Sequence, residues 1–283
     1  MNRFTKATEK LQKVLARAGL GSRREVEEWI KNGRVKIDER LAEIGDRVNE
    51  GNVIRLDGRV INIKPSAEIR RRVVIYNKPN GEICSRKDPE NRPTVFDNLP
   101  NLFQGRWLSV GRLDINTSGL LLFTNDGELA NKLMHPSTEI ERHYAVRVHG
   151  DVLPIHIQRL RQGVELDDGM ANFDAISSSG GEGRNQWFKV AIKEGRNREV
   201  RRMWESQELE VSRLIRIQYG PIILPRTLPR GVWSELDDYQ VNELAKVAGL
   251  PAKNIERRMR DNKQMRSKRI MSKRRRAPRK NRT

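Results

Sequence analysis

The spacing of apolar and polar positions divides the chain into a small N-terminal unit and a larger one that follows it. Apolar residues recur at helical intervals from residue 11, and Gly19 ends this predicted helix. Ser22 and Glu25 have the spacing of a capping box, which predicts a second helix that runs to about Asn32. Short alternating segments at 35–37 and 53–56 predict strands. We therefore expect one domain over residues 1–63.

From residue 73 onward the pattern changes to short apolar runs separated by Gly-rich turns. We expect strands at 73–76, 120–123, 144–148, 164–166, 173–177, 187–192 and 214–217, and short helices at 127–134 and 198–206. This mixture predicts an α+β domain over residues 73–250, built on a mixed and mainly antiparallel sheet. The polar stretch 64–72 contains Pro65 and predicts a linker.

Charge is concentrated at the C-terminal end. The formal net charge is +19, and Lys253–Thr283 holds 15 Lys/Arg but only 2 Asp/Glu. Residues 251–283 are too charged to bury surface, so we expect a disordered basic tail. A chain of this charge predicts a polyanionic partner, and nucleic acid is favoured over a membrane because no basic amphipathic helix with a broad apolar face is present.

Cysteine and histidine usage argues against several classes of site. Cys84 is the only cysteine, which excludes an internal disulfide and a cysteine-based zinc site. The four histidines lack a metal-ligand spacing, and we expect neither a metal nor a cofactor. The chain begins without an apolar segment of signal-peptide length and contains no long apolar run, so we expect a cytoplasmic protein.

The stretch from Val110 to Gly127 carries the candidate chemistry. If its start is a strand, Arg112 and Asp114 lie on one face, followed by a turn and a second strand. The pair is either an ion pair at a hairpin or a reactive carboxylate beside a cation. A second cationic turn at 195–203 leads into a helix, where Arg201 would hold the Asp114 carboxylate ionised by charge pairing. A phosphate-binding patch is the alternative for this turn.

Residues 11–38 resemble an S4 domain, a two-helix RNA-binding module found in ribosomal proteins and RNA-modifying enzymes. The resemblance implies that the basic residues around the two helices contact RNA, whereas their pattern alone is equally consistent with a solvated helix face. The expected contacts are Arg17, Arg23, Arg24 and Lys31.

Four ordered motifs, at 76–79, 110–114, 141–144 and 195–201, resemble the RsuA-type ribosomal RNA pseudouridine synthases. The resemblance implies that Asp114 is the nucleophile and that Tyr144 packs on the target base and serves in proton removal. It also implies that Arg201 pairs with the aspartate and that Arg112 fills the space left by the flipped base. We expect Arg196 and Arg198 to contact RNA. Segments 92–97 and 125–131 and the basic tail are most similar to members that act on large-subunit rRNA.

Together these features predict an enzyme that isomerises uridine to pseudouridine in 23S ribosomal RNA. Its partner would be that RNA or a large-subunit assembly intermediate, and we expect a monomer that needs no small-molecule cofactor. Two alternatives remain open. One is a non-catalytic S4-type RNA-binding or ribosome assembly factor, and the other is a pseudouridine synthase that acts on 16S rRNA or tRNA.

Overall fold

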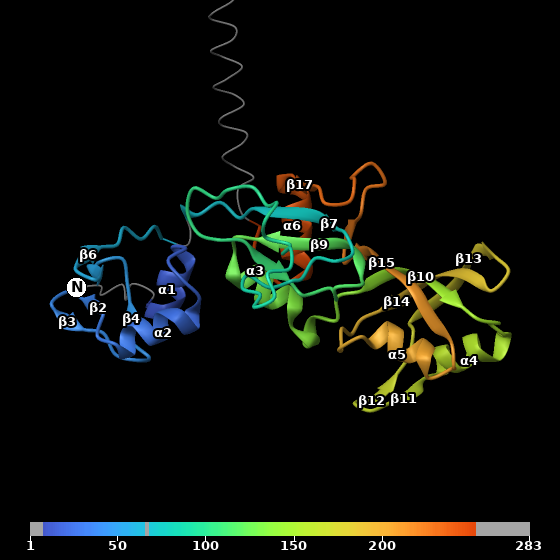
Figure 1. The fold of residues 1–283 in the computed structure, drawn as a ribbon. Coiled ribbons are helices and arrows are strands. Elements are labelled where there is room, and N and C mark those ends of the chain that lie inside the picture. The colour runs from blue at the N-terminus through green and yellow to red at the C-terminus, as the bar shows by residue number, and fades with distance from the viewer. Residues whose placement is uncertain (1–7, 66–67, 253–283) are drawn as a thin grey trace, which may run out of the picture.

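A computed structural model describes residues 8–65 and 68–252, and it shows an elongated molecule with the N-terminal unit at one end (Figure 1). The predicted tail therefore lies, apart from residues 251 and 252, outside the described residues. Within the described part of the chain, no helix is long and apolar enough to cross a membrane.

The N-terminal unit packs two helices against short strands around its own core. The capping box predicted for the second helix is confirmed, since the Ser22 hydroxyl accepts from the Glu25 amide at 3.1 Å and the Glu25 carboxylate accepts from the Ser22 amide at 2.7 Å. Leu11, Val26 and Val35 are fully buried in this core. The elements are β1 (Glu9–Lys10), α1 (Leu11–Arg17), α2 (Arg23–Lys31), β2 (Val35–Ile37), β3 (Arg40–Leu41), β4 (Arg47–Val48), β5 (Ile54–Leu56) and β6 (Arg59–Val60).

The larger unit is organised around a mixed sheet whose strands, in the described residues, follow the order β13-β14-β10-β15-β9-β7-β17. The pairing of β9 with β15 is parallel and the other pairings are antiparallel, as the predicted fold class requires. Two further strands, β8 and β16, pair with β9 and β15. The strands are β7 (Val73–Lys78), β8 (Leu108–Val110), β9 (Ser118–Thr124), β10 (Arg142–His149), β13 (Ala175–Glu182), β14 (Asn185–Ile192), β15 (Glu210–Tyr219), β16 (Ile222–Ile223) and β17 (Trp233–Glu235).

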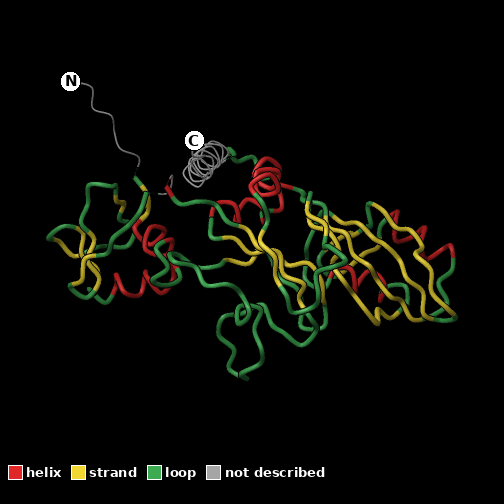
Figure 2. Tube along the Cα trace, turned by 90° about the horizontal axis from the view of Figure 1, so that it is seen from above, coloured by secondary structure: helices red, strands yellow, loops and turns green. Residues whose placement is uncertain are grey.

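Helices cover both faces of this sheet. Figure 2 shows the helices and strands of the larger unit from above. The helices α3 (Gly127–Met134) and α6 (Asp238–Val247) pack on one face, and α4 (Pro154–Gln162) and α5 (Glu199–Glu205) pack on the other. Along β9, Leu120 and Leu122 face the first pair while Leu121 and Phe123 face the second. This two-sided burial explains why the strand is an uninterrupted apolar run without alternation. A 3-10 turn (Pro136–Thr138) and a hairpin of β11 (Val164–Leu166) and β12 (Gly169–Ala171) complete the unit.

One expectation for the candidate site is wrong. Arg112 and Asp114 do not continue a strand, because β8 ends at Val110 and both residues lie in the loop before β9. Gly111 turns the chain out of the sheet with a φ of 76°, a conformation that favours glycine. The helices α4 and α6 were not predicted from the sequence. Each follows a loop, and neither begins with a strong apolar period.

Candidate active site

Asp114 lies at the start of a tight turn between β8 and β9. The Thr117 amide donates to the Asp114 carbonyl at 3.0 Å, which closes the turn predicted for this segment. The preceding residue, Leu113, is buried, whereas Arg112 is exposed. The Leu113 side chain therefore anchors the loop between the polar side chains of Arg112 and Asp114. The half-buried Asp114 carboxylate makes no hydrogen bond or ion pair with any residue that the structure describes. Its oxygens are therefore available to a substrate.

Lys78, the last residue of β7, binds the backbone of this turn. Its side chain is completely buried, and its ammonium group donates to the carbonyls of Pro79 at 3.0 Å, Asp114 at 3.1 Å and Thr117 at 2.9 Å. The three bonds use all three ammonium protons. Burial lowers the pKa of Lys78. The turn that carries Asp114 is thus fixed by a buried cation that binds backbone oxygens.

Cys84 binds both backbone polar groups of Leu113, the residue before Asp114. The thiol donates to the Leu113 carbonyl at 3.3 Å and accepts from the Leu113 amide at 3.4 Å. Burial raises the pKa of the Cys84 thiol, which remains in its neutral donor form near neutral pH. The Gly81 amide binds the carbonyl of Ile115 at 2.8 Å on the far side of Asp114. Contacts from the segment after β7 therefore fix the backbone before and after the carboxylate.

Arg201, on α5, reaches the same turn from the opposite side. Its guanidinium is buried and donates to the carbonyls of Asn116 at 2.9 Å and Val211 at 2.7 Å. Burial lowers the pKa of this guanidinium, and the Asp114 charge opposes the shift. Within the described residues the two side chains form no direct ion pair. Arg201 therefore acts on Asp114 through the turn and through its charge.

The sheet register brings Tyr144 to this turn. Tyr144 of β10 pairs with Arg216 of β15, and Arg216 pairs with Gly119 of β9, which follows the turn. Two strand spacings therefore separate the Tyr144 backbone from the Gly119 backbone, a distance of about 10 Å. Gly119 has a φ of 100°, and a Cβ there would overlap the Arg216 carbonyl. Tyr144 and Leu113 belong to the same buried cluster. The topology thus places Arg201 against the turn and Tyr144 two strands away from its end, while Arg112 remains exposed in the same loop.

The predicted RNA contacts of the N-terminal unit lie apart from this turn. Arg23 and Arg24 are exposed in the first turn of α2. Arg17 is bound to Glu9, and Lys31 pairs with Glu28 at 2.8 Å. A cavity of about 570 Å³ between this unit and the larger one is lined by Arg17, Arg23 and Arg24, but not by Lys31. The site thus has two parts, a carboxylate turn and a cationic junction.

Comparison with known proteins assigns the chain. The family described as RNA pseudouridylate synthase matches residues 72–206, and the S4 domain matches residues 9–54. The ribosomal large subunit pseudouridine synthase B of Pasteurella multocida is 60% identical over 246 residues, which are 86% of this chain and 71% of that protein. The protein of the same name from Escherichia coli K12 is 59% identical over 86% of this chain and 84% of its own length.

The chain belongs to the pseudouridine synthase family. A crystal structure of a pseudouridylate synthase has the same fold, with a TM-score of 0.58 at 23% identity over 83% of this chain and 99% of that one. Pseudouridine synthases isomerise uridine and need no cofactor, which confirms the enzyme class expected from the four motifs.

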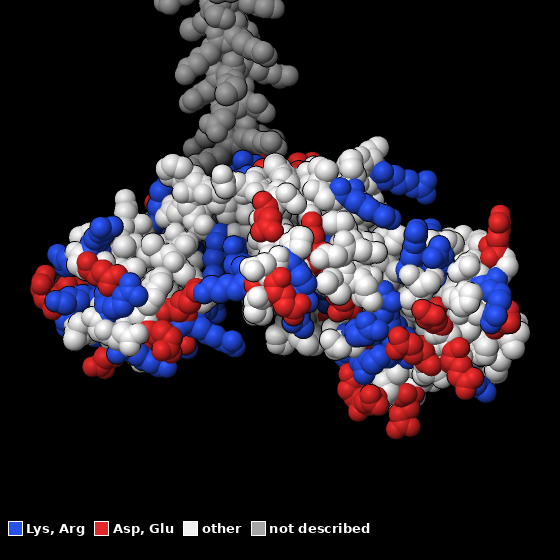
Figure 3. Space-filling model, in the orientation of Figure 1, with Lys and Arg blue, Asp and Glu red and all other residues white. Residues whose placement is uncertain are grey.

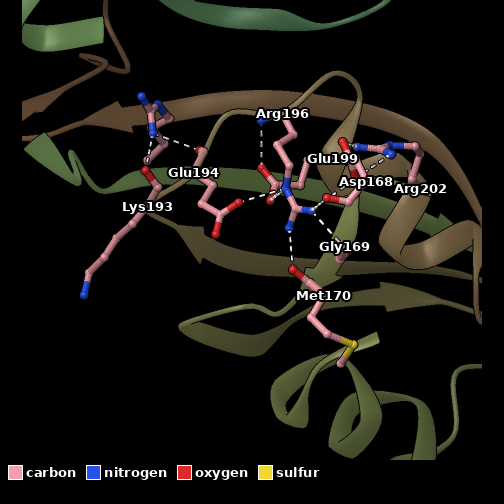
Figure 4. Close-up of polar contacts among 9 residues, drawn as sticks. Asp168, Gly169, Met170, Lys193, Glu194, Arg196, Glu199 and Arg202 are labelled. Atoms are coloured by element: carbon pink, nitrogen blue, oxygen red, sulfur yellow. Dashed lines mark hydrogen bonds and ion pairs between the residues drawn. The ribbon is translucent and has the colours of Figure 1, made fainter. Parts of the chain in front are cut away.

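In this pseudouridine synthase, Arg196 is occupied by protein groups (Figure 4). Its guanidinium binds the carboxylates of Asp168, Glu194 and Glu199 and the carbonyls of Gly169 and Met170. Asp168 also pairs with Arg202 at 2.8 Å. These contacts join the β11–β12 hairpin to the start of α5. A phosphate could reach Arg196 only by displacing them.

Arg198 differs from Arg196 in its exposure. It sits at the start of α5 with a φ of 48°, and its side chain is 39% exposed and pairs with Glu205 at 3.5 Å. An exposed pair of this length contributes little to stability. Of Arg196 and Arg198, Arg198 is the one whose guanidinium remains accessible.

Sequence reasoning missed Lys78 and Cys84 as parts of the pseudouridine synthase site. Lys78 was part of a matching motif, but Lys-Pro by itself indicates only a turn. Its partners Asp114 and Thr117 are 36 and 39 residues away. Because those partners are backbone oxygens, no side-chain pattern could have identified them. A lysine within an otherwise buried strand was the available signal.

Proposed function

We propose that this enzyme converts a uridine of large-subunit (23S) ribosomal RNA to pseudouridine, with Asp114 as the nucleophile. The observation that carries the proposal is the Asp114 turn. Its carboxylate has no partner among the residues that the structure describes, while its backbone is held by Lys78, Cys84 and Arg201. Such rigid placement is what a reaction at one target atom requires. The names of the relatives support the choice of large-subunit RNA.

The reaction requires a base that has left the RNA stack, which costs a few kcal/mol. Arg112 is exposed next to Asp114 and would occupy the vacated position with its planar guanidinium. Arg198 adds an accessible cation for a neighbouring phosphate. In this assignment Arg112 serves the RNA, and it does not neutralise the acid.

The isomerisation exchanges one glycosidic bond for another. Asp114 forms a transient covalent bond to the ribose or to the uracil ring, and the bond between N1 and the ribose breaks. The ring rotates, its C5 bonds to the ribose, the bond to Asp114 breaks and frees the carboxylate, and the C5 proton leaves while N1 gains one. Tyr144 packs on the ring and serves in removal of the C5 proton. Atoms and electrons balance without an oxidant, a reductant or an energy source.

RNA binding is assigned to the first domain, residues 1–63, and to the tail. Arg23 and Arg24 are exposed and would contact phosphates, with Arg17 and Lys31 nearby. The tail, residues 253–283, lies outside the described part of the chain, and its role rests on its charge. Truncation after Leu250 should weaken binding and flatten its salt dependence, because each phosphate contact contributes roughly 0.7–0.9 to the slope. The enzyme would act as a monomer in the cytoplasm, on rRNA or on an assembling particle.

Asp114→Asn tests the proposal. We expect pseudouridine formation to be abolished while binding to large-subunit rRNA persists, because the amide keeps the shape of the carboxylate. Asp151→Asn, at an exposed loop position, is the matched control and should retain activity. Unchanged modification by Asp114→Asn would remove Asp114 as nucleophile. Mapping pseudouridines in total RNA of a deletion strain decides between 23S rRNA, 16S rRNA and tRNA as the substrate.

A further inference from the structure

Phe103 is the most exposed large apolar side chain in the described residues, with a relative exposure of 101%. Leaving a phenylalanine in water forgoes the favourable free energy of burying its ring. Of its two chain neighbours, Leu102 is partly buried against the core and Gln104 is polar, so neither extends the exposed ring into an apolar patch suited to a protein partner. An isolated, fully presented aromatic ring is instead suited to stacking.

The loop that presents Phe103 is fixed at both ends. The Trp107 indole is buried and donates to the Pro100 carbonyl at 2.6 Å, which closes the loop. Gly105 packs against the end of α1, where a Cβ at Gly19 would lie 2.8 Å from the Gly105 oxygen. Two residues span at most about 7 Å, so Phe103 lies within that distance of the contact between the S4 domain and the catalytic domain.

Arginines converge at the same junction. Arg23 from α2, Arg86 and Arg106 line the cavity between the two domains. Burial lowers the pKa of Arg106; the Glu25 charge opposes this shift, and the Arg23 charge adds to it. Burial also lowers the pKa of Arg86, and the Arg106 charge adds to that shift. These cations repel one another, and the nearby Glu25 is engaged by Ser22 and Lys87. Figure 3 shows blue side chains gathered where the N-terminal lobe meets the central body.

We propose that Phe103 and these three arginines form a binding site for one unpaired nucleotide of the RNA. The base stacks on Phe103, and the adjoining phosphate lies among Arg23, Arg86 and Arg106. Aromatic stacking and arginine pairing are the two interactions by which proteins hold single-stranded RNA. The inference rests on the proposed function, because it takes RNA as the ligand. It adds a contact that joins both domains to the same strand.

The test uses the full chain and two RNA probes, a blunt RNA duplex and the same duplex with a single-stranded uridine extension. Phe103→Ala and Phe103→Leu should bind the extended probe roughly 5- to 150-fold more weakly, the range expected for one lost stacking contact. Phe103→Tyr should bind as the unchanged chain does. None of these variants should change binding to the blunt duplex. Tyr239→Ala, which removes another exposed aromatic ring, is the matched control.

The salt dependence separates the ring from the arginines. Arg106→Gln should reduce the slope of the logarithm of affinity against the logarithm of salt concentration by roughly 0.7, as expected for one phosphate of a single strand. Phe103→Ala should leave that slope unchanged. An equal loss of slope in both variants would overturn the assigned roles.

Three results would overturn the site. Normal binding of the extended probe by Phe103→Ala would exclude stacking, and full rescue by Phe103→Leu would show an apolar contact that needs no ring. Normal RNA binding combined with lost association with assembling ribosomal particles would identify a protein partner. Pseudouridine formation by the unchanged chain is measured in parallel on large-subunit rRNA. If the unchanged chain forms no pseudouridine, the proposed function is refuted. If it forms pseudouridine and Phe103→Ala binds the extended probe normally, only the nucleotide site is refuted.

Discussion

The buried ammonium of Lys78 donates to the backbone carbonyl of Asp114 at 3.1 Å. The bond joins the end of β7 to the residue proposed to attack the substrate. Because it is made to the main chain, it fixes the position of Asp114 and leaves the carboxylate free to react. A hydrogen bond from the lysine to the side chain would instead have occupied a carboxylate oxygen.

Lys78→Met should therefore damage both the fold and the reaction. It removes the lysine donor from three carbonyls, of which that of Thr117 is buried and that of Asp114 keeps the Thr117 amide, and this should lower the free energy of unfolding by about 2 kcal/mol. In the folded fraction we expect a fall in kcat with little change in RNA affinity, since the turn moves but the RNA surface does not. Denaturant unfolding and steady-state kinetics measure the two effects. Lys132→Met, at an exposed position on α3, is the control, and a wild-type kcat for Lys78→Met would contradict the positioning role.

Gly119→Ala tests the junction between β9 and β15. The new Cβ would overlap the Arg216 carbonyl and lie 2.9 Å from the Arg216 amide, so the strands must separate. We expect a loss of roughly 1–3 kcal/mol in unfolding free energy, together with reduced kcat as the Asp114 turn moves away from Tyr144. Gly231→Ala is the control, because Gly231 also has a positive φ but a Cβ there would have no atom within 4 Å. The comparison separates the steric overlap at Gly119 from backbone strain. Equal effects in the two variants would refute the steric explanation.

Arg201→Lys tests whether Arg201 acts by its shape as well as its charge. A lysine keeps the charge near Asp114 but cannot bind the Asn116 and Val211 carbonyls with one planar group. Since small displacements of a reacting group are costly, we expect kcat to fall between about 10- and 100-fold while RNA binding is kept. Arg213→Lys, at an exposed position of β15, should have no effect. Full activity in Arg201→Lys would show that charge alone suffices.

The parts of the fold that could be predicted from sequence are those with local signals. The Ser22–Glu25 capping box and the apolar run of β9 are readable within a few residues, and both elements were predicted. The site is different, because Cys84, Lys78 and Arg201 act on the Asp114 turn through backbone groups distant in sequence. Asp114 itself could be singled out only through the ordered motifs that resemble a family. Arg112 was wrongly placed on a strand. The alternation of polar and apolar residues around it does not reveal that Gly111 turns the chain out of the sheet.

Glu82 provides a prediction in pH. The Tyr76 hydroxyl donates to both of its carboxylate oxygens, at 2.9 and 2.8 Å, and burial raises the pKa of Glu82 above its usual value of 4.5. The folded state therefore binds this proton more tightly than the unfolded chain does. Stability should fall as the pH rises from 4.5 through the raised pKa, because the buried group must then ionise. Glu82→Gln keeps an acceptor for Tyr76 and removes the charge.

We therefore expect Glu82→Gln to gain stability relative to the unchanged chain as the pH rises, and to lose that advantage below pH 4.5. Denaturant unfolding at a series of pH values measures the difference. Glu39→Gln, whose side chain is 92% exposed, should follow the profile of the unchanged chain. A Glu82→Gln variant whose relative stability does not change with pH would show that Glu82 titrates as it does in the unfolded chain. A relative stability that falls with rising pH would show that Glu82 is held ionised, through the charge of the nearby Lys78, against the cost of its burial.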